Sequence, residues 1–272
     1  MRKIILSLMA PAAMVAFVAS AAAADLPVKA PPIQYPVLTN WGGWYVGLNV
    51  GYSWGRASID YAQGPSDFFG VDTPGNTVAL STHLSPQSFI GGGQVGFNYQ
   101  TGAWVWGFET DIAWRNRSDA VSMVLDSLND TLTLSDNQRW VGTVRGRVGY
   151  SPQAASNWLI YATGGFAYGN FEHGVTQFCN VGCNQTQAFS DSKTLAGWTV
   201  GGGVEVALDR NWSLGAEYLY MDFEKDTLAV AAAGTPPLPA PGATTFPATT
   251  VSFHDTSQVA RLKLNYRFGD LH

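Results

Sequence analysis

The sequence is poor in charge and in cysteine, and it has few long apolar runs. Charged residues make up 13% of its 272 residues, about half of the roughly 25% that is typical of soluble domains. Mean hydropathy is +0.00, and the one long apolar run lies at the N-terminus, so nothing in the remaining sequence requires a transmembrane helix. The formal net charge of −5 gives no support for nucleic-acid binding.

The N-terminal run is typical of an export signal. Arg2 and Lys3 precede a short apolar core, and an alanine run ends at Ala24, which is the order found in secretory signal peptides. Residues 1–24 are therefore predicted to be a signal peptide rather than a membrane anchor. Residues 25–40 are rich in proline and are predicted to form an extended periplasmic tail.

Alternation with a period of two dominates the rest of the chain. From Trp104 to Trp114 large apolar residues share one face of a strand, whereas small residues and two acids share the other. Successive side chains of a strand point to opposite faces, and about eleven tilted residues cover the roughly 25 Å apolar band of an outer membrane. The pattern favours a lipid-facing side and a polar lumen side. A soluble sandwich or lipocalin-type barrel also alternates, so this segment alone leaves both open.

The connections between such segments decide between these alternatives. They alternate between long and short, and outer-membrane barrels have long external loops and short periplasmic turns. Aromatic residues near both ends of the apolar faces fit two interfacial girdles. The sequence therefore predicts an all-β fold, an eight-stranded antiparallel transmembrane up-and-down β-barrel over residues 41–272, with strands at about 44–54, 89–99, 104–114, 140–150, 158–168, 195–208, 212–223 and 256–268. External loops are expected at about 55–87, 115–138, 170–193 and 224–255.

Charged residues gather on the predicted inward faces. Hairpin pairing places Glu109 roughly opposite Arg145, and Glu217 near Arg261 or Lys263. The interior of a barrel of about eight strands is only wide enough for side chains, and an unpaired buried charge is costly. The favoured interpretation is a structural ion-pair network that fills the lumen, and the alternative is a narrow or gated pore. The predicted network is Glu109, Asp111, Arg145, Arg147, Glu205, Glu217, Arg261 and Lys263. The seventh strand pattern is weaker, because Leu219 and Met221 fall on the side of Glu217.

Cysteine and histidine residues offer few further sites. Cys179 and Cys183 lie in the third predicted loop, where export permits a disulfide between them, and no second ligand pair with metal-site spacing lies nearby. His83, His173 and His254 lie in or beside predicted loops, where lone histidines are usually only solvated. No spacing supports a Ser/His/acid or Asp/His catalytic cluster. No metal, cofactor, catalytic residue or enzyme activity is therefore predicted.

Four short motifs, in their order along the chain, resemble a known family. They are the exported start Ala24-Asp25-Leu26-Pro27, the opening strand Trp44-Tyr45-Val46-Gly47, a glycine-rich sixth strand and the ending Leu264-Asn265-Tyr266-Arg267-Phe268. Together they resemble the Omp25/Omp31-like outer-membrane proteins of alphaproteobacteria, within the OmpA-like or opacity-type eight-stranded barrels, over nearly the whole mature chain.

The resemblance implies a location in the outer membrane of a Gram-negative cell, in contact with outer-membrane lipid and lipopolysaccharide. It also implies that the barrel assembly machinery reads Tyr266 and Phe268 as an assembly signal, although in this chain residues 269–272 follow Phe268.

A non-enzymatic structural role in envelope integrity, with surface-exposed loops, is the favoured function. A small passive diffusion pore of porin type is one alternative. A surface binding protein or adhesin is another, since some members of the family are associated with haemin binding. The long loops leave room for an extracellular ligand that the sequence does not identify.

Overall fold

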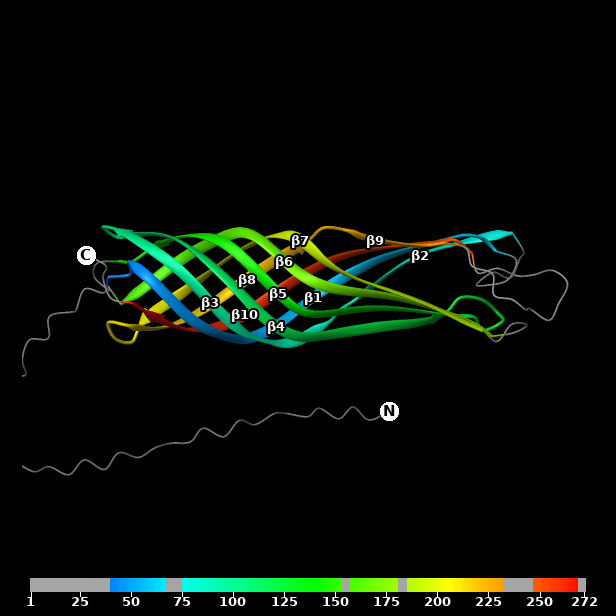
Figure 1. Cartoon of the computed structure of the whole chain (residues 1–272), viewed down its shortest axis with the longest axis horizontal. Coiled ribbons are helices and arrows are strands. Elements are labelled where there is room, and N and C mark those ends of the chain that lie inside the picture. Colours follow the sequence, from blue (N-terminus) through cyan, green and yellow to red (C-terminus); the bar gives the residue numbers. More distant parts are fainter. Residues whose placement is uncertain (1–39, 67–74, 153–156, 181–184, 232–246, 269–272) are drawn as a thin grey trace, which may run out of the picture. The chain divides into compact units, whose positions relative to one another are not determined.

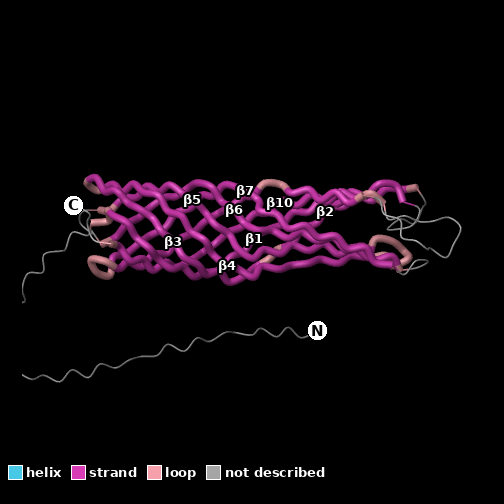
Figure 2. The backbone as a smooth tube through the Cα atoms, in the orientation of Figure 1, coloured by secondary structure: helices cyan, strands magenta, loops and turns pink. Residues whose placement is uncertain are grey.

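The computed structural model describes residues 40–66, 75–152, 157–180, 185–231 and 247–268. Every helix or strand assigned among them is a β-strand (Figure 2). In this part of the chain no helix is long and apolar enough to cross a membrane. The predicted signal peptide and nearly all of the predicted proline-rich tail lie outside the described residues.

The strands are much longer than the lipid-facing segments predicted from the sequence. In chain order they are β1 (Gly43–Ser66), β2 (Asn76–Leu84), β3 (Gln87–Thr101), β4 (Trp104–Val124), β5 (Thr131–Tyr150), β6 (Trp158–Cys179), β7 (Gln185–Ala207), β8 (Trp212–Phe223), β9 (Asp226–Val230) and β10 (Thr249–Arg267).

All ten strands belong to one antiparallel sheet. Their order is β2-β1-β3-β4-β5-β6-β7-β8-β10-β9, and β1 also pairs with β10, from Tyr45 with Arg267 to Gln63 with Thr249. Because β1 and β10 lie near opposite ends of this order, their pairing closes the sheet on itself (Figure 1). Closure pairs backbone N–H and C=O groups between strands, which is a requirement for any sheet placed in lipid.

The predicted number of eight strands is not confirmed, because the described residues form ten. In two places, two consecutive strands lie end to end along the same partner strand. β2 and β3 both pair with β1, with Ser85 and Pro86 between them, and β8 and β9 both pair with β10. A proline cannot donate a ladder hydrogen bond, which accounts for the first interruption.

The ranges predicted to be long loops are strand for much of their length, and this part of the prediction is wrong. β1 continues from Trp54 to Ser66, and β4 continues from Trp114 to Val124. Inward and outward side chains continue to alternate beyond the last outward aromatic residue of each strand. Beyond that residue the outward side chains are mostly polar, so a prediction based on outward apolar residues ends the strand too early.

Two sections of the sheet follow from this reversal. In the girdled section the outward side chains are large and apolar, for example Leu48 with 69% and Phe89 with 80% exposure. We define it as residues 44–54, 89–99, 104–114, 140–150, 158–168, 198–208, 212–222 and 258–268. In the extension the outward side chains are mostly polar. It comprises the strand residues within 55–66, 76–84, 115–124, 131–138, 170–179, 185–196, 226–230 and 249–256.

The inward face changes in the opposite sense. Along β1 the inward residues Tyr45, Asn49 and Ser53 of the girdled section give way to Ala57 and Ile59 in the extension, with no change of register against β10. The interior of the extension contains an apolar cluster made of Ala57, Ile59, Tyr61, Leu84, Leu132, Leu134, Val175, Val251 and Phe253. It also holds buried polar residues, which include Arg117, Asp136, His173 and Asp255. The interior of the girdled section is mostly polar and holds the candidate site.

Candidate functional site

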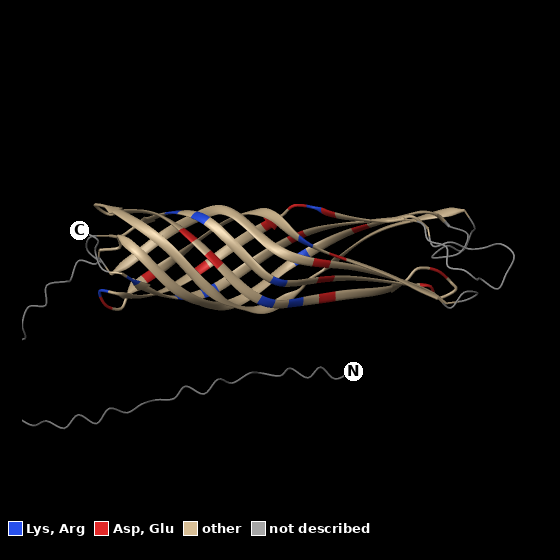
Figure 3. Ribbon diagram, viewed as in Figure 1, with Lys and Arg blue, Asp and Glu red and all other residues tan. Residues whose placement is uncertain are grey.

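All eight charged residues predicted to face inward lie inside the girdled section. Each is at most 5% exposed to solvent. They come from five strands, and Figure 3 shows acidic and basic positions distributed along the strands. Their side chains form one connected network. Its members are Glu109 and Asp111 of β4, Arg145 and Arg147 of β5, Glu205 of β7, Glu217 of β8, and Arg261 and Lys263 of β10.

Several of the ion pairs join neighbouring strands. Glu109 lies directly opposite Arg145 in the β4–β5 register, and Arg145 Nη2 is 2.6 Å from Glu109 Oε1. Glu217 lies opposite Arg261 in the β8–β10 register, with 2.6 Å between Arg261 Nη2 and Glu217 Oε2. Both pairings are those that the hairpin arrangement predicts from the sequence.

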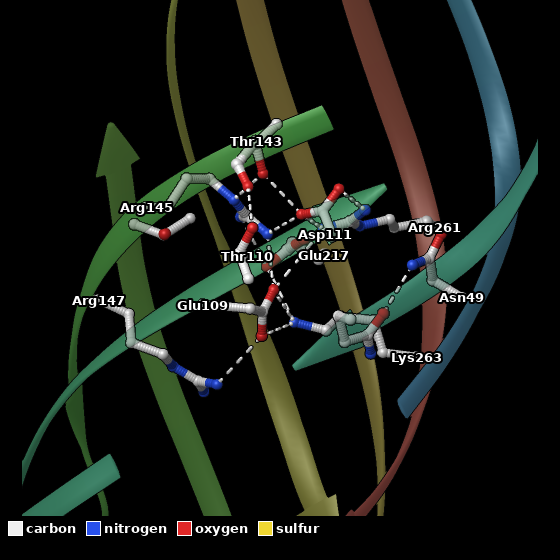
Figure 4. A network of polar contacts seen from close by, with 12 residues as sticks. Asn49, Glu109, Thr110, Asp111, Thr143, Arg145, Arg147, Glu217, Arg261 and Lys263 are labelled. Carbon is white, nitrogen blue, oxygen red and sulfur yellow. Dashed lines mark hydrogen bonds and ion pairs between the residues drawn. The ribbon is translucent and has the colours of Figure 1, made fainter. Parts of the chain in front are cut away.

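Other ion pairs cross the interior between strands that are not neighbours. Lys263 Nζ of β10 is 2.6 Å from Glu109 Oε2 of β4, and Arg145 Nη1 of β5 is 3.2 Å from Glu217 Oε1 of β8. Figure 4 shows Glu109 and Asp111 facing bases from both β5 and β10. The network therefore ties opposite walls of the closed sheet together.

Neutral polar side chains, for which the sequence predicts no role, complete the network. Tyr45 Oη donates to Glu109 Oε2 at 2.6 Å, Tyr161 Oη donates to Glu217 Oε1 at 2.9 Å, and Thr143 Oγ1 donates to Asp111 Oδ2 at 2.6 Å. The guanidinium carbon of Arg147 lies 4.0 Å from the centre of the Tyr161 ring, within range of a cation–π contact. The alternation of each strand places these residues on the inward face, and this is the feature of the sequence from which they could have been predicted.

Glycine makes room for these side chains. A Cβ atom on Gly96 would overlap the ring of Tyr45, and a Cβ atom on Gly47 would overlap the amides of Asn265 and Gln94. The high glycine content, which is unusual for strands, is explained at these two positions by close approach of large inward side chains.

The site contains equal numbers of negative and positive charges. Four carboxylates face four cations, and each carboxylate accepts at least one charge-assisted hydrogen bond from a buried base. Removing one member of such a pair leaves its partner as an uncompensated buried charge. The arrangement is suited to holding the interior closed and fixing the strands relative to one another.

The predicted assembly signal lies on the outer face at the end of β10. The Tyr266 and Phe268 rings are 5.4 Å apart, and the backbone N–H of Phe268 donates to Trp44 O at 2.9 Å. Phe268 is 49% exposed. Residues 269–272 lie outside the described residues, and recognition of this end by the assembly machinery stays a prediction.

The predicted disulfide is only partly within the described residues. Cys179 ends β6, is buried, and is not a free thiol. Cys183 lies outside the described residues, so the pairing of the two stays a prediction.

The histidines of the predicted loops differ in their surroundings. His254 lies on the outer face, where Nε2 is 2.9 Å from Asp222 Oδ1. His173 is 1% exposed and lies inside the extension, so the expectation of a solvated side chain is wrong for this residue. Its position inside the sheet follows from the continuation of β6 through the range predicted to be a loop.

Comparison with known proteins gives consistent results. A family model described as outer membrane protein beta-barrel domain matches residues 10–269. The 31 kDa outer-membrane immunogenic protein of Brucella melitensis is 34% identical over 258 residues, which is 93% of this chain and 95% of that protein. The 25 kDa outer-membrane immunogenic protein of Brucella canis is 28% identical over 226 residues, 81% of this chain and 85% of that protein. The solved structure of OprG from Pseudomonas aeruginosa is 16% identical, with a TM-score of 0.48 over 86% of this chain and 99% of that chain.

Proposed function

The chain belongs to the outer-membrane β-barrel proteins of the Omp25/Omp31 type and is located in the outer membrane, and from this premise we propose that it is a sealed, non-enzymatic barrel. Its role is structural, to support the envelope and to hold the extension in place. We propose that it contacts outer-membrane lipid and lipopolysaccharide, and the apolar outward face of the girdled section supports the contact with lipid.

The burial of the interior charges carries this proposal. A water-filled pore lined by charged residues would leave their side chains exposed to solvent along the channel. Here the side chains of the eight network residues are between 0 and 4% exposed. The ion pairs that cross the interior, such as Lys263 with Glu109, occupy the space through which water would pass.

Single-channel recording in a planar bilayer tests the sealed interior. The refolded protein is first shown to be a barrel by its gel shift on heating, and a general porin serves as the positive control. We expect no resolved openings from the wild-type protein. The double variant Glu109→Ala and Arg145→Ala removes one acid and one base, which keeps the charge balance, and we expect it to leak. Steady openings of the wild-type barrel that change in this variant would establish a pore instead.

A second proposal concerns the extension. Its outward residues on β1, such as Arg56, Ser58 and Asp60, are exposed and polar, as is expected for strands that stand in water. The relatives are named as immunogenic proteins, which supports a surface that is accessible from outside the cell. We propose that the extension lies on the extracellular side.

Cysteine labelling of intact cells tests this orientation. A membrane-impermeant maleimide should label Ser58→Cys in the extension. It should not label Arg210→Cys, which lies in the turn between β7 and β8 at the other end of the sheet, until the outer membrane is opened. Labelling of Arg210→Cys alone in intact cells would reverse the orientation.

A further inference from the structure

Three side chains with metal-ligating atoms meet inside the extension, away from the interior ion-pair network. Asp136 of β5 and His173 of β6 are directly paired across neighbouring strands, and Asp255 comes from β10 on another part of the wall. All three are at most 1% exposed. One imidazole nitrogen and one carboxylate oxygen from each acid lie within 4.8 Å of one another.

The two carboxylates each divide their oxygens between two neighbours. Asp136 Oδ2 and Asp255 Oδ1 lie 3.3 Å and 3.4 Å from Arg117 Nη2. The other oxygens face His173, whose Nε2 is 3.6 Å from Asp136 Oδ1 and 3.2 Å from Asp255 Oδ2. Ligands that are about 2.1 Å from a metal ion are separated by about 3.0–3.4 Å in octahedral or tetrahedral geometry. The converging atoms are therefore close to the separation that a small divalent ion requires.

Asp136 supplies an independent indication of a missing ligand. Its side chain is fully buried, and neither carboxylate oxygen accepts a hydrogen bond from any described residue. Buried polar groups in native proteins are nearly always satisfied. Asp136 has only the 3.3 Å ion pair with Arg117 and the 3.6 Å contact with His173, so its oxygens retain the capacity to bind a further cation.

His173 is held in the orientation of a metal ligand. Its Nδ1 is hydrogen-bonded to Asp226 Oδ2 at 2.9 Å, and its ring stacks on Phe253 with 4.1 Å between centroids and a 3° interplanar angle. A carboxylate that accepts a hydrogen bond from Nδ1–H fixes the tautomer in which the lone pair of Nε2 can bind a metal. A metal ion at Nε2 would replace the hydrogen bond between Nε2 and Asp255 Oδ2, which is 3.2 Å long.

We propose that Asp136, His173 and Asp255 bind a divalent first-row transition-metal ion such as Zn²⁺ or Mn²⁺. The ligand atoms are Asp136 Oδ1, Asp255 Oδ2 and His173 Nε2, with Asp226 as the positioning residue. One nitrogen and two carboxylates suit these ions better than Ca²⁺ or Mg²⁺, which take oxygen ligands. The sequence predicted no metal site, because the three ligands come from three separated segments that were read as loops or their edges.

The strand edge nearest to the site is that of β9. Among the described residues β9 pairs with β10 and with no strand on its other side, which faces β7. The ion pair between Lys193 Nζ of β7 and Asp226 Oδ1 of β9, at 3.1 Å, spans this edge. The side chain of Lys193 is half-exposed, so an ion that enters at this edge would displace Lys193 from Asp226.

Metal titration of the full barrel tests the proposal. The untagged protein is refolded in detergent, freed of metal with a chelator, and titrated at pH 8 with Zn²⁺ and separately with Co²⁺, whose visible absorption reports a bound nitrogen ligand. We expect one equivalent of Zn²⁺ per folded chain. Asp136→Asn and His173→Gln should each lose that equivalent. Asp226→Asn should bind about 10–100-fold more weakly, as is found when an outer partner of a ligating histidine is removed.

His254→Gln is the matched control, because His254 is adjacent to Asp255 in sequence but lies on the outer face beside Asp222. It should bind as the wild-type protein does. The gel shift on heating confirms that each variant is folded, and the wild-type titration alone decides the question if a ligand variant fails to fold. A folded wild-type barrel that takes up neither ion would overturn the proposal. Binding that survives Asp136→Asn and His173→Gln, or that is lost in His254→Gln, would also overturn it. The sealed interior is tested separately by conductance and stands or falls independently.

Discussion

The girdled section and the extension share most of their strands, and β1 keeps one register against β10 through both, yet their inward faces differ in chemistry. Inside the girdled section Glu109 and Arg145 pair across the interior wall, and inside the extension Ile59 and Leu132 are fully buried among apolar neighbours. The outward faces change in the opposite sense. The surrounding medium accounts for this trend, because lipid outside leaves only the interior for polar groups, whereas water outside permits an apolar core. In the extension this core lies in the same interior as the buried Arg117, Asp136 and Asp255.

The boundary between the two sections explains why the alternation of the seventh predicted strand is weak. Leu219 and Met221 share the inward face with Glu217, which weakened the seventh strand pattern. In the structure they join Phe223 and Val259 in an apolar cluster. This cluster begins where the polar interior ends. The alternation along β8 is weak because its inward residues pass from the polar interior into the apolar cluster.

The largest expected effect comes from breaking the charge balance of the girdled section. Glu109→Ala leaves Lys263 and Arg145 without their shared carboxylate in a buried site. We expect the free energy of unfolding to fall by about 3–5 kcal/mol, measured by urea unfolding in lipid vesicles. Asp60→Ala, on the exposed face of the extension, should change it by less than about 1 kcal/mol. Equal losses for both variants would contradict the contrast between the two sections.

A buried apolar residue provides the corresponding test in the extension. Leu132→Ala opens a cavity in the core that contains Leu134 and Phe253, and we expect a loss of about 2–5 kcal/mol in the same assay. Val124→Ala removes an exposed side chain at the end of β4 and should stay within about 0.5 kcal/mol. A loss below that limit for Leu132→Ala would show that the extension has no packed core.

Arginine placed on the outward face locates the edge of the membrane. Leu48→Arg lies at the middle of the girdled part of β1 and should destabilise the barrel by about 2–4 kcal/mol in lipid. Ser58→Arg has the same outward phase in the extension and should change stability by no more than about 0.5 kcal/mol. A large penalty at Ser58 would move the edge of the apolar band into the extension.

The smallest effect is a dependence on alkaline pH. Burial raises the pKa of Tyr61 in the extension to about 12, above its usual value near 10. Because the folded state holds the proton more tightly, the contribution of Tyr61 to stability is complete below pH 10. It is lost as the pH rises toward 12. Unfolding of Tyr61→Phe should therefore depend less on pH over this interval than unfolding of the wild-type protein, and identical curves would argue for a hydrated interior.

The sequence predicted those parts of the fold and site that depend on one strand or one hairpin. The segment from Trp104 to Trp114 and the pairing of Glu109 with Arg145 are of this kind, since periodicity and a short turn determine both. The continuation of β1 through Ile59 was missed, because a fixed search for outward apolar residues cannot follow a reversal of polarity. The meeting of Asp136 with Asp255 depends on closure of the whole sheet, which no local pattern contains.

The length of β1 determines how far the barrel extends beyond the membrane. Trp44–Trp54 is enough to cross the apolar band, and the strand then continues to Ser66, about 40 Å further along its own direction at roughly 3.3 Å per residue. Its neighbour β10 continues with it, and so do β4, β5 and β6, which pair with one another in the extension. The projecting part is therefore a hydrogen-bonded sheet rather than a set of separate strands. A macromolecule too bulky to approach the bilayer could therefore still make contact with the far ends of these strands.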